Sequence, residues 1–369
     1  MLSVAVSWDL YVETKSAVVL GNVGFVQVAP FLLFALAAGH VADRHDRRQV
    51  MVLTQVVAIG ATAILIGHYR PVLLIYSTLF LTAAARSFQG PARMAILPHV
   101  VPDGLLTNAI TWHSSAQEIA SVSGPAVAGV LIASAGTRTV YVVQLVCAAL
   151  TLLCFALLRP VAKGDGAIPA DRKDLLDGVR FVRANPLILS AISLDLFAVL
   201  FGGATALLPI FAVDILHSGA RGLGWLRAAP SVGAVSMALA LSHRPRAKRA
   251  GRVLLIAVAG FGAATIVFGV SRWFWLSAGM LLLTGAFDNV SVVLRQSLVQ
   301  TKTPDYLKGR VLAVQNIFIS CSNQLGAVES GWTAAWFGPV ISVVGGGAAT
   351  VAIVAGFAAG AAALRKWTQ

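Results

Sequence analysis

Charged side chains are scarce in this sequence, and this scarcity limits the folds that it can adopt. Only 12% of the 369 residues are Asp, Glu, Lys or Arg, while 57% are hydrophobic and the mean hydropathy is +0.81. Soluble globular domains carry about 25% charged residues. So large an apolar surface is compatible with a bilayer, where lipid rather than water meets the side chains. The composition therefore excludes a soluble domain and predicts an all-α polytopic membrane protein.

Residue patterns that carry enzyme chemistry are also missing. Cys147, Cys154 and Cys321 lie in apolar segments and lack metal-ligand spacing. The seven histidines are scattered, mostly near predicted loops, and no Walker phosphate-binding sequence occurs. We therefore expect no metal centre, no cofactor, no ATP drive within this chain and no enzymatic activity.

Acidic residues are outnumbered by basic ones, 15 to 28, which gives a net charge of +13. Such a charge can indicate nucleic-acid binding when it covers one face of a domain. Here the basic residues form short clusters between apolar runs, as in the cytoplasmic loops of membrane proteins. We therefore expect no nucleic-acid partner and attribute the charge to membrane topology.

Twelve apolar segments are predicted as membrane-spanning helices. The predicted spans are 1–12, 18–39, 50–68, 71–97, 105–134, 138–158, 187–214, 222–242, 253–270, 273–299, 310–335 and 338–364. The first is short, because 12 helical residues extend about 18 Å and the hydrocarbon core is about 30 Å thick. Either the true start lies upstream, or half of a helix has been lost.

Basic residues give these spans an orientation. With both termini in the cytoplasm, most of the 28 Lys and Arg residues fall in cytoplasmic loops, as the positive-inside rule requires. The few on the opposite side are Lys15, Arg70, Arg138, Arg221 and Arg272. We therefore expect a multi-pass protein in contact with the lipid bilayer, with both termini cytoplasmic.

The two halves of the chain are similar at one constant offset. The segment 92–103 shares its Arg, Pro and Asp, without a gap, with the segment 294–305, which lies 202 residues later. Parallel repeats of six helices occur in transporters. The predicted units are an N-terminal six-helix bundle at 1–158, a cytoplasmic linker with an amphipathic helix at 159–186, and a C-terminal six-helix bundle at 187–369.

The first polar loop carries a motif with specific spacing. Gly39 is followed by Asp43 and Arg44, and then by the basic pair Arg47 and Arg48. This pattern resembles the loop signature of major facilitator transporters, which joins helices 2 and 3. Glycine lets the turn approach a neighbouring helix because it lacks a Cβ. Asp43 can cap helix 3, or can pair with an arginine across the cytoplasmic mouth as a latch that breaks on opening.

Further motifs resemble one subgroup of that superfamily. They are Trp8-x-x-Tyr11, Gly90-Pro91-Ala92-Arg93, Gly124-Pro125-x-x-x-Gly129 and Gly309-Arg310. The pattern resembles the bacterial drug and siderophore exporters related to the enterobactin exporter. This resemblance implies the major facilitator fold, a bacterial inner-membrane location, a monomer and a proton gradient as the energy source.

The proline and glycines of helix 5 resemble the export-associated motif of drug antiporters. Pro125 removes a backbone hydrogen bond and can kink the helix. Gly124 and Gly129 permit tight contact with a helix of the other half. Ordinary packing of small residues is the alternative explanation.

Two charged residues occupy equivalent positions in the two halves. Arg86 lies in the fourth span, and Asp288 lies 202 residues later in the tenth. Ionisable groups inside membrane spans usually face a partner or a water-filled cavity. We expect Arg86 and Asp288 to interact near mid-membrane, directly or through water, unless each has its own partner. Arg93 and Arg295, nearer the cytoplasmic ends, are expected to extend toward the membrane surface.

Carboxyl groups inside the spans are the candidates for a proton carrier. Glu118, near the middle of helix 5, is the first candidate; Asp288 is the second, and Asp195 in helix 7 is another. A carboxyl group in an apolar cavity can exchange protons near neutral pH.

Together, the residues and the resemblance predict a secondary transporter. Its substrate is a small amphipathic molecule, drug-like or siderophore-like, that is exported in exchange for protons by alternating access. Two alternatives stay open. One is an importer of a small metabolite. The other is an N-terminally truncated or degenerate paralogue that does not transport, which the short first helix supports.

Overall fold

The computed structural model describes residues 1–67, 70–102, 105–158, 172–243, 249–304, 307–365 and 367. Within these ranges the protein is helical and contains no strand, which confirms the predicted all-α fold. The helices of the first half are α1 (Leu2–Thr14), α2 (Ala17–Arg44), α3 (Arg47–Ile64), α4 (Val72–Val100) and α5 (Leu106–Leu157). Those of the second half are α6 (Arg172–Ala184), α7 (Pro186–Gly202), η1 (Ala204–Leu207), α8 (Leu208–Ile210), η2 (Phe211–Ile215), α9 (Gly219–Ser242), α10 (Ala250–Val270), α11 (Phe274–Lys302), α12 (Lys308–Phe337), α13 (Pro339–Gly360) and α14 (Ala362–Arg365).

The long helix α5 corresponds to two predicted spans. Gly136 interrupts it with φ 80° and ψ 169°, in the left-handed region that favours glycine. The arm after Gly136 runs back beside α3, because the Gln55 side chain donates to the Ala148 carbonyl at 2.9 Å and Arg48 donates to the Ala156 carbonyl. The single kinked element therefore crosses the bundle twice.

The predicted span 187–214 is not one regular helix. It consists of α7, a break at Gly203, and the short turns η1, α8 and η2. Pro209 lies in this region, and proline cannot donate a backbone hydrogen bond to a regular helix. With this adjustment and the division of α5, every predicted span has a helical counterpart.

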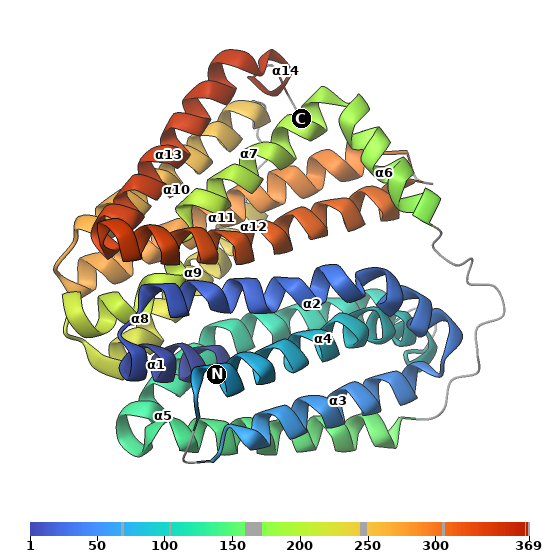
Figure 1. Ribbon diagram of the computed structural model, residues 1–369. Coiled ribbons are helices and arrows are strands. Elements are labelled where there is room, and N and C mark those ends of the chain that lie inside the picture. The colour runs from blue at the N-terminus through green and yellow to red at the C-terminus, as the bar shows by residue number, and fades with distance from the viewer. Residues whose placement is uncertain are drawn as a thin grey trace.

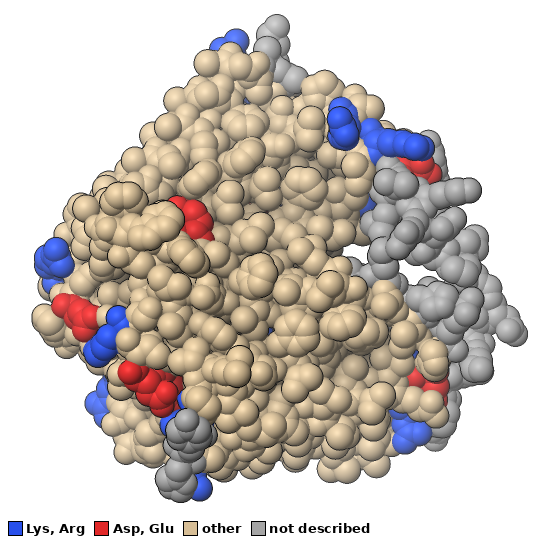
Figure 2. Space-filling model, in the orientation of Figure 1, with Lys and Arg blue, Asp and Glu red and all other residues tan. Residues whose placement is uncertain are grey.

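An apolar band surrounds the bundle. Eight helical stretches among the described residues are long and apolar enough to cross a bilayer, and one of them is the double-length α5. On the face shown in Figure 2, Lys, Arg, Asp and Glu gather mainly at the two ends, and the wide middle is almost free of them. This distribution is that of a multi-pass membrane protein.

The helices form two bodies that diverge toward the end where α6 lies (Figure 1). In the figure α2, α3, α4 and α5 lie below, and α7, α10, α11, α12 and α13 lie above. The bodies are joined mainly where α2 packs on α12 and α5 packs on α9. We call the α6 end, which carries Arg48, Arg180 and Arg310, the basic end; the other is the opposite end.

The halves meet at glycines. A Cβ on Gly21 of α2 would lie 2.8 Å from the Cα of Gly331 on α12. On α5, a Cβ on Gly129 would lie 2.7 Å from the Cα of Gly224 on α9. At both crossings the backbones are too close to admit a side chain, as is common where membrane helices pack tightly.

The helix-5 motif lies at the second crossing, between α5 and α9. The carbonyl of Pro125 packs on Gly224, as Gly129 does. Gly124 is different, because a Cβ there would make only an ordinary contact with Met1, at 3.5 Å. The structure therefore places Pro125 and Gly129, but not Gly124, against the other half.

The internal repeat is visible in the helix bounds. α4 (Val72–Val100) and α11 (Phe274–Lys302) each have 29 residues, and their first and last residues differ by the 202-residue offset found in the sequence. The two helices are therefore equivalent elements of the two halves.

The loop between α2 and α3 differs from expectation. α2 continues to Arg44, so Asp43 lies in its last turn and does not cap α3. Asp46 takes that role, because its side chain accepts from the Arg48 backbone N–H at 2.9 Å. The side chains of Asp43 and Arg44, and the surroundings of Gly39, lie outside the described residues.

Replacing Gly331 by Ala should weaken the α2–α12 crossing. The added methyl group meets the α2 backbone, and overpacking of this kind costs about 1–3 kcal/mol. We expect the melting temperature of the purified protein to fall by several degrees. Gly345→Ala is the matched control, because no atom lies within 4 Å of a Cβ there; equal melting temperatures for the two variants would contradict the tight crossing.

Candidate functional site

A cavity of about 680 Å³ lies between the two halves. Its walls come from α1, α2, α4 and the second arm of α5 on one side and from α12 on the other. It extends toward the basic end as far as Pro91 on α4 and Ala313 on α12. Its volume is within the range of sites for drug-sized molecules.

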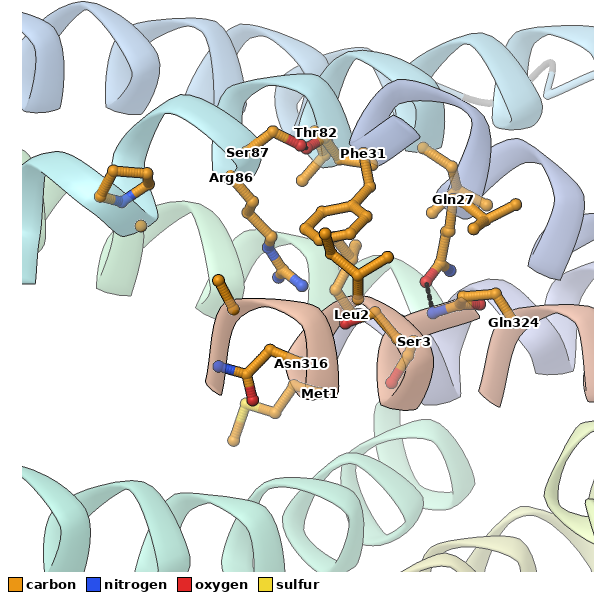
Figure 3. Close-up of a pocket in the computed structure, with 18 of the residues that line it drawn as sticks. Met1, Leu2, Ser3, Gln27, Phe31, Thr82, Arg86, Ser87, Asn316 and Gln324 are labelled. Carbon is orange, nitrogen blue, oxygen red and sulfur yellow. Dashed lines mark hydrogen bonds between the residues drawn. The ribbon is translucent and has the colours of Figure 1, made fainter. Parts of the chain in front are cut away.

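Amide and hydroxyl groups from both halves face this cavity. Gln324 of α12 donates to the side-chain carbonyl of Gln27 on α2 at 3.3 Å, so one hydrogen bond joins the halves across the cavity (Figure 3). Asn316 of α12 lies opposite Arg86 of α4, whose guanidinium extends from its helix into the space (Figure 3). The cavity therefore offers several neutral polar side chains and one cationic side chain, that of Arg86, to a bound molecule.

A second cavity of about 200 Å³ adjoins the first. Ser3, Gln27, Leu79 and Gln324 line both of them. The second cavity lies nearer the opposite end and is bordered by Arg227 of α9. The two cavities therefore lie next to each other along the interface between the halves.

The opposite end is closed by contacts between the halves. The Tyr11 hydroxyl of α1 donates to Asp214 of η2, and the Lys15 ammonium lies 3.6 Å from the same carboxylate. Within the first half, Asp9 accepts from Arg70 and from the Tyr141 hydroxyl, both at 2.7 Å. The Tyr11 and Lys15 contacts therefore join the two halves at that end.

A charged cluster is buried inside the second half. Arg295 of α11 and Asp195 of α7 are 2% and 5% exposed, and their Nη1 and Oδ2 atoms are 2.6 Å apart. The Ser291 hydroxyl accepts from the Arg295 Nε at 3.2 Å. Asp195, Asp288 and Ser291 line the same small pocket between α7, α10 and α11. Arg295 therefore forms an ion pair with Asp195, and the Asp288 carboxyl group lies beside that pair in the same pocket.

This cluster differs from the charge pair that the sequence suggested. Asp288 lies with Asp195 inside the second half, whereas Arg86 faces the central cavity. Among the described residues the structure contains no Arg86–Asp288 ion pair. Equivalent positions in the two repeats place two residues at the same depth in the membrane, but they do not determine which neighbours the two side chains contact. Arg295 also departs from expectation, because it turns inward to Asp195 rather than extending to the membrane surface.

Glu118 lies in a different environment from the two aspartates. It is exposed on the first arm of α5, where its nearest side-chain partner is the Ser121 hydroxyl at 3.5 Å. It does not line either cavity. Of the three candidate carboxyl groups, only Asp195 and Asp288 lie together.

The motif at the start of α12 contacts the amphipathic helix α6. Arg310 lies 3.4 Å from the Asp177 carboxylate, and Gly178 packs on the Arg310 backbone. Among the described residues, no other segment of the chain comes within 4 Å of a Cβ built on Gly309. In the part of the chain that the structure describes, no group of three His, Cys, Asp or Glu could hold a metal ion.

Several lining residues carry no sequence signal. Gln27, Gln144, Asn316 and Gln324 face the central cavity, yet neutral amides inside apolar runs belong to no motif considered above. Their only recognisable feature is that a polar group within a membrane span needs a partner or water.

Arg295→Gln should strongly destabilise the protein. It leaves Asp195 as an unpaired buried charge, and breaking one partner of such a pair costs about 3–5 kcal/mol. The double variant Asp195→Asn/Arg295→Gln removes both charges, so we expect it to recover most of the lost melting temperature. A double variant no more stable than Arg295→Gln would contradict the pairing.

Known proteins that are similar to this chain are transporters. The family model described as "Transmembrane secretion effector" matches residues 1–369. Macrolide efflux protein A of Streptococcus pyogenes is 25% identical over 225 residues, which are 59% of this chain and 56% of that protein. The chain therefore matches little more than half the length of that relative. Enterobactin exporter EntS of Escherichia coli O1:K1 / APEC is 26% identical over 351 residues, which are 94% of this chain and 84% of the exporter.

Solved transporter structures share the fold. An inward-facing, unoccupied bacterial homolog of the human lysosomal transporter Spinster has a TM-score of 0.71 at 16% identity, covering 98% of this chain and 93% of its own. The nucleoside transporter NupG has a TM-score of 0.72 at 13% identity, covering 100% and 95%. These likenesses confirm the predicted architecture.

Proposed function

The chain belongs to the transmembrane secretion effector family of major facilitator transporters, and on that premise we propose that it exports a small amphipathic molecule in exchange for protons. The observation that carries this proposal is the central cavity, which lies between the halves and is closed at one end by Tyr11, Lys15 and Asp214. Rocking of one half against the other would expose this cavity alternately to the two sides of the membrane.

The direction of export follows from the orientation of the bundle. Basic loops favour the cytoplasmic side, so the basic end faces the cytoplasm of a bacterial inner membrane. The cavity extends toward that end, so its substrate enters from the cytoplasm. The contacts at the opposite end then form the external gate, which opens to release the substrate.

The proton site is the pair Asp195 and Asp288 with Arg295. If both carboxylates were ionised, the cluster would hold one net negative charge in the membrane interior, which is costly. Binding one proton neutralises it, because a single arginine then faces a single carboxylate. Asp288 accepts the proton, because Arg295 forms its ion pair with Asp195.

A packed contact connects the proton site to the substrate cavity. Val199 lines the pocket that holds Asp195 and Asp288, and a Cβ on Gly326 of α12 would lie 2.9 Å from the Val199 carbonyl oxygen. Gln324, which lines the cavity, is two residues from Gly326 on the same helix. A shift of α7 on protonation therefore moves α12 and the cavity wall.

Asp288→Asn should abolish proton coupling. In inside-out membrane vesicles with an acidic interior, the wild-type protein is expected to release protons when a transported drug or siderophore is added. The variant cannot exchange a proton at this position and should show no substrate-dependent release. Glu118→Gln is the control and should behave like wild type. Loss of coupling in Glu118→Gln with retention in Asp288→Asn would overturn the assignment.

Asp214→Asn should favour the outward-open state. It weakens the contacts with Tyr11 and Lys15, and exposed ion pairs of this kind contribute about 0.2–1 kcal/mol. A single cysteine at Ser7, which lines the second cavity, should then react up to about fivefold faster with an external, membrane-impermeant maleimide. Asp177→Asn, at the basic end, should not accelerate labelling. A rate unchanged by Asp214→Asn would exclude this gate.

A further inference from the structure

The two adjoining cavities are lined by arginines and, among the described residues, by no carboxylate. Their described linings contain Arg86 and Arg227, and neither lining includes an Asp or a Glu. The remaining polar side chains are the amides of Gln27, Gln144, Asn316, Asn323 and Gln324, with several hydroxyl groups. Any charge that a bound molecule meets here is therefore positive.

Two other arginines of the bundle contrast with these two. Arg295 lies 2.6 Å from Asp195, and Arg70 lies 2.7 Å from Asp9. Arg86 and Arg227 have no carboxylate within ion-pairing distance among the described residues. The Arg86 side chain is accessible from the cavity, extending from α4 toward α12 (Figure 3). Arg295 and Arg70 are therefore paired with carboxylates of the protein, whereas the two cavity arginines, Arg86 and Arg227, have no such partner among the described residues.

An open arginine in a membrane protein needs an anion. The guanidinium stays protonated under all physiological conditions, and a charge inside the membrane is costly unless it has a partner or water. A carboxylate, phenolate or sulfonate group supplies that partner and can accept two parallel hydrogen bonds from one guanidinium.

The rest of the central cavity suits an organic molecule larger than a simple ion. Val28, Phe31, Leu79 and Ile317 provide apolar walls. The volume of about 680 Å³ is that of a site for a drug-sized ligand. An inorganic anion would leave most of this space and all of the apolar surface unused.

We propose that the substrates are amphipathic organic anions whose acidic group pairs with Arg86 in the central cavity. Arg227 lies nearer the opposite end and provides a second cationic contact along the exit route. This inference rests on the proposed export function and specifies its substrate class. Arg86 is therefore a specificity-determining residue, because a neutral molecule of the same shape leaves its charge unpaired.

Two probes of one scaffold test the proposal. 8-Anilinonaphthalene-1-sulfonate carries a sulfonate, and N-phenyl-1-naphthylamine is the same aryl amine without it. Saturable binding of each is measured by fluorescence on the full chain in nanodiscs, against empty nanodiscs. The variants are Arg86→Gln, Arg86→Lys and the double variant Arg86→Gln/Arg227→Gln. Arg221→Gln is the control of matched charge, because Arg221 is exposed and lines neither cavity.

The proposed anion site predicts a specific pattern of probe affinities among these variants. Arg86→Gln should weaken binding of the sulfonate by about tenfold or more, because one charge-assisted contact is lost. Arg86→Lys should stay within about threefold of wild type, Arg221→Gln should bind normally, and the double variant should lose saturable sulfonate binding. Binding of the neutral probe should be equal in all variants. The melting temperature of Arg86→Gln should not fall, since no ion pair is broken.

Two results would overturn the anion site. One is wild-type sulfonate binding by Arg86→Gln, and the other is an equal loss of neutral-probe binding in that variant, which would indicate a structural role. Transport of both probes in energised inside-out vesicles separates this inference from the export proposal. Arg86-dependent binding without transport supports the anion site and contradicts export of this probe. Proton-driven transport of the neutral probe that is unaffected by Arg86→Gln supports export and contradicts the anion site.

Discussion

The backbone contact between helices of opposite halves determines where everything else in this protein can lie. Gly21 meets Gly331, and Gly129 meets Gly224, with no side chain between the helices. Because the halves touch where α2 crosses α12 and where α5 crosses α9, the cavity between the halves lies beside these two crossings. The same feature therefore positions the cavity between the halves.

In the proposed mechanism, charged residues at two locations have two different functions. The cluster of Asp195, Asp288 and Arg295 lies inside one half, where a proton can change its net charge without meeting the substrate. Arg86 and Arg227 line the space between halves, where a bound molecule can meet them. In the proposed mechanism, the proton site and the cavity would be coupled by helix packing, through Gly326 of α12 against α7.

Much of the architecture could be predicted because it follows from hydrophobicity and repetition. The spans, the kinked pair of arms in α5 and the equivalence of α4 with α11 all have signals in the sequence. Partners of the buried charges could not be predicted. Arg295 pairs with Asp195 from a helix about 100 positions earlier, and only the packed structure shows which faces of α7 and α11 meet. Similarly, Glu118 has the depth of a proton carrier but lies on an exposed face of α5.

The absence of acidic groups from the described cavity linings has an electrical consequence. A monoanion that leaves the cell in exchange for one entering proton moves two positive charge equivalents inward in each cycle. Each charge gains about 2.3 kcal/mol per 100 mV of membrane potential. Such a transporter would be driven mainly by voltage and would continue to export when the pH gradient alone has collapsed. Exchange of a monovalent cation for one proton would be electroneutral and would gain nothing from the membrane potential. Because the Arg86 guanidinium in the cavity favours an anionic substrate, it also determines that the membrane potential contributes to export.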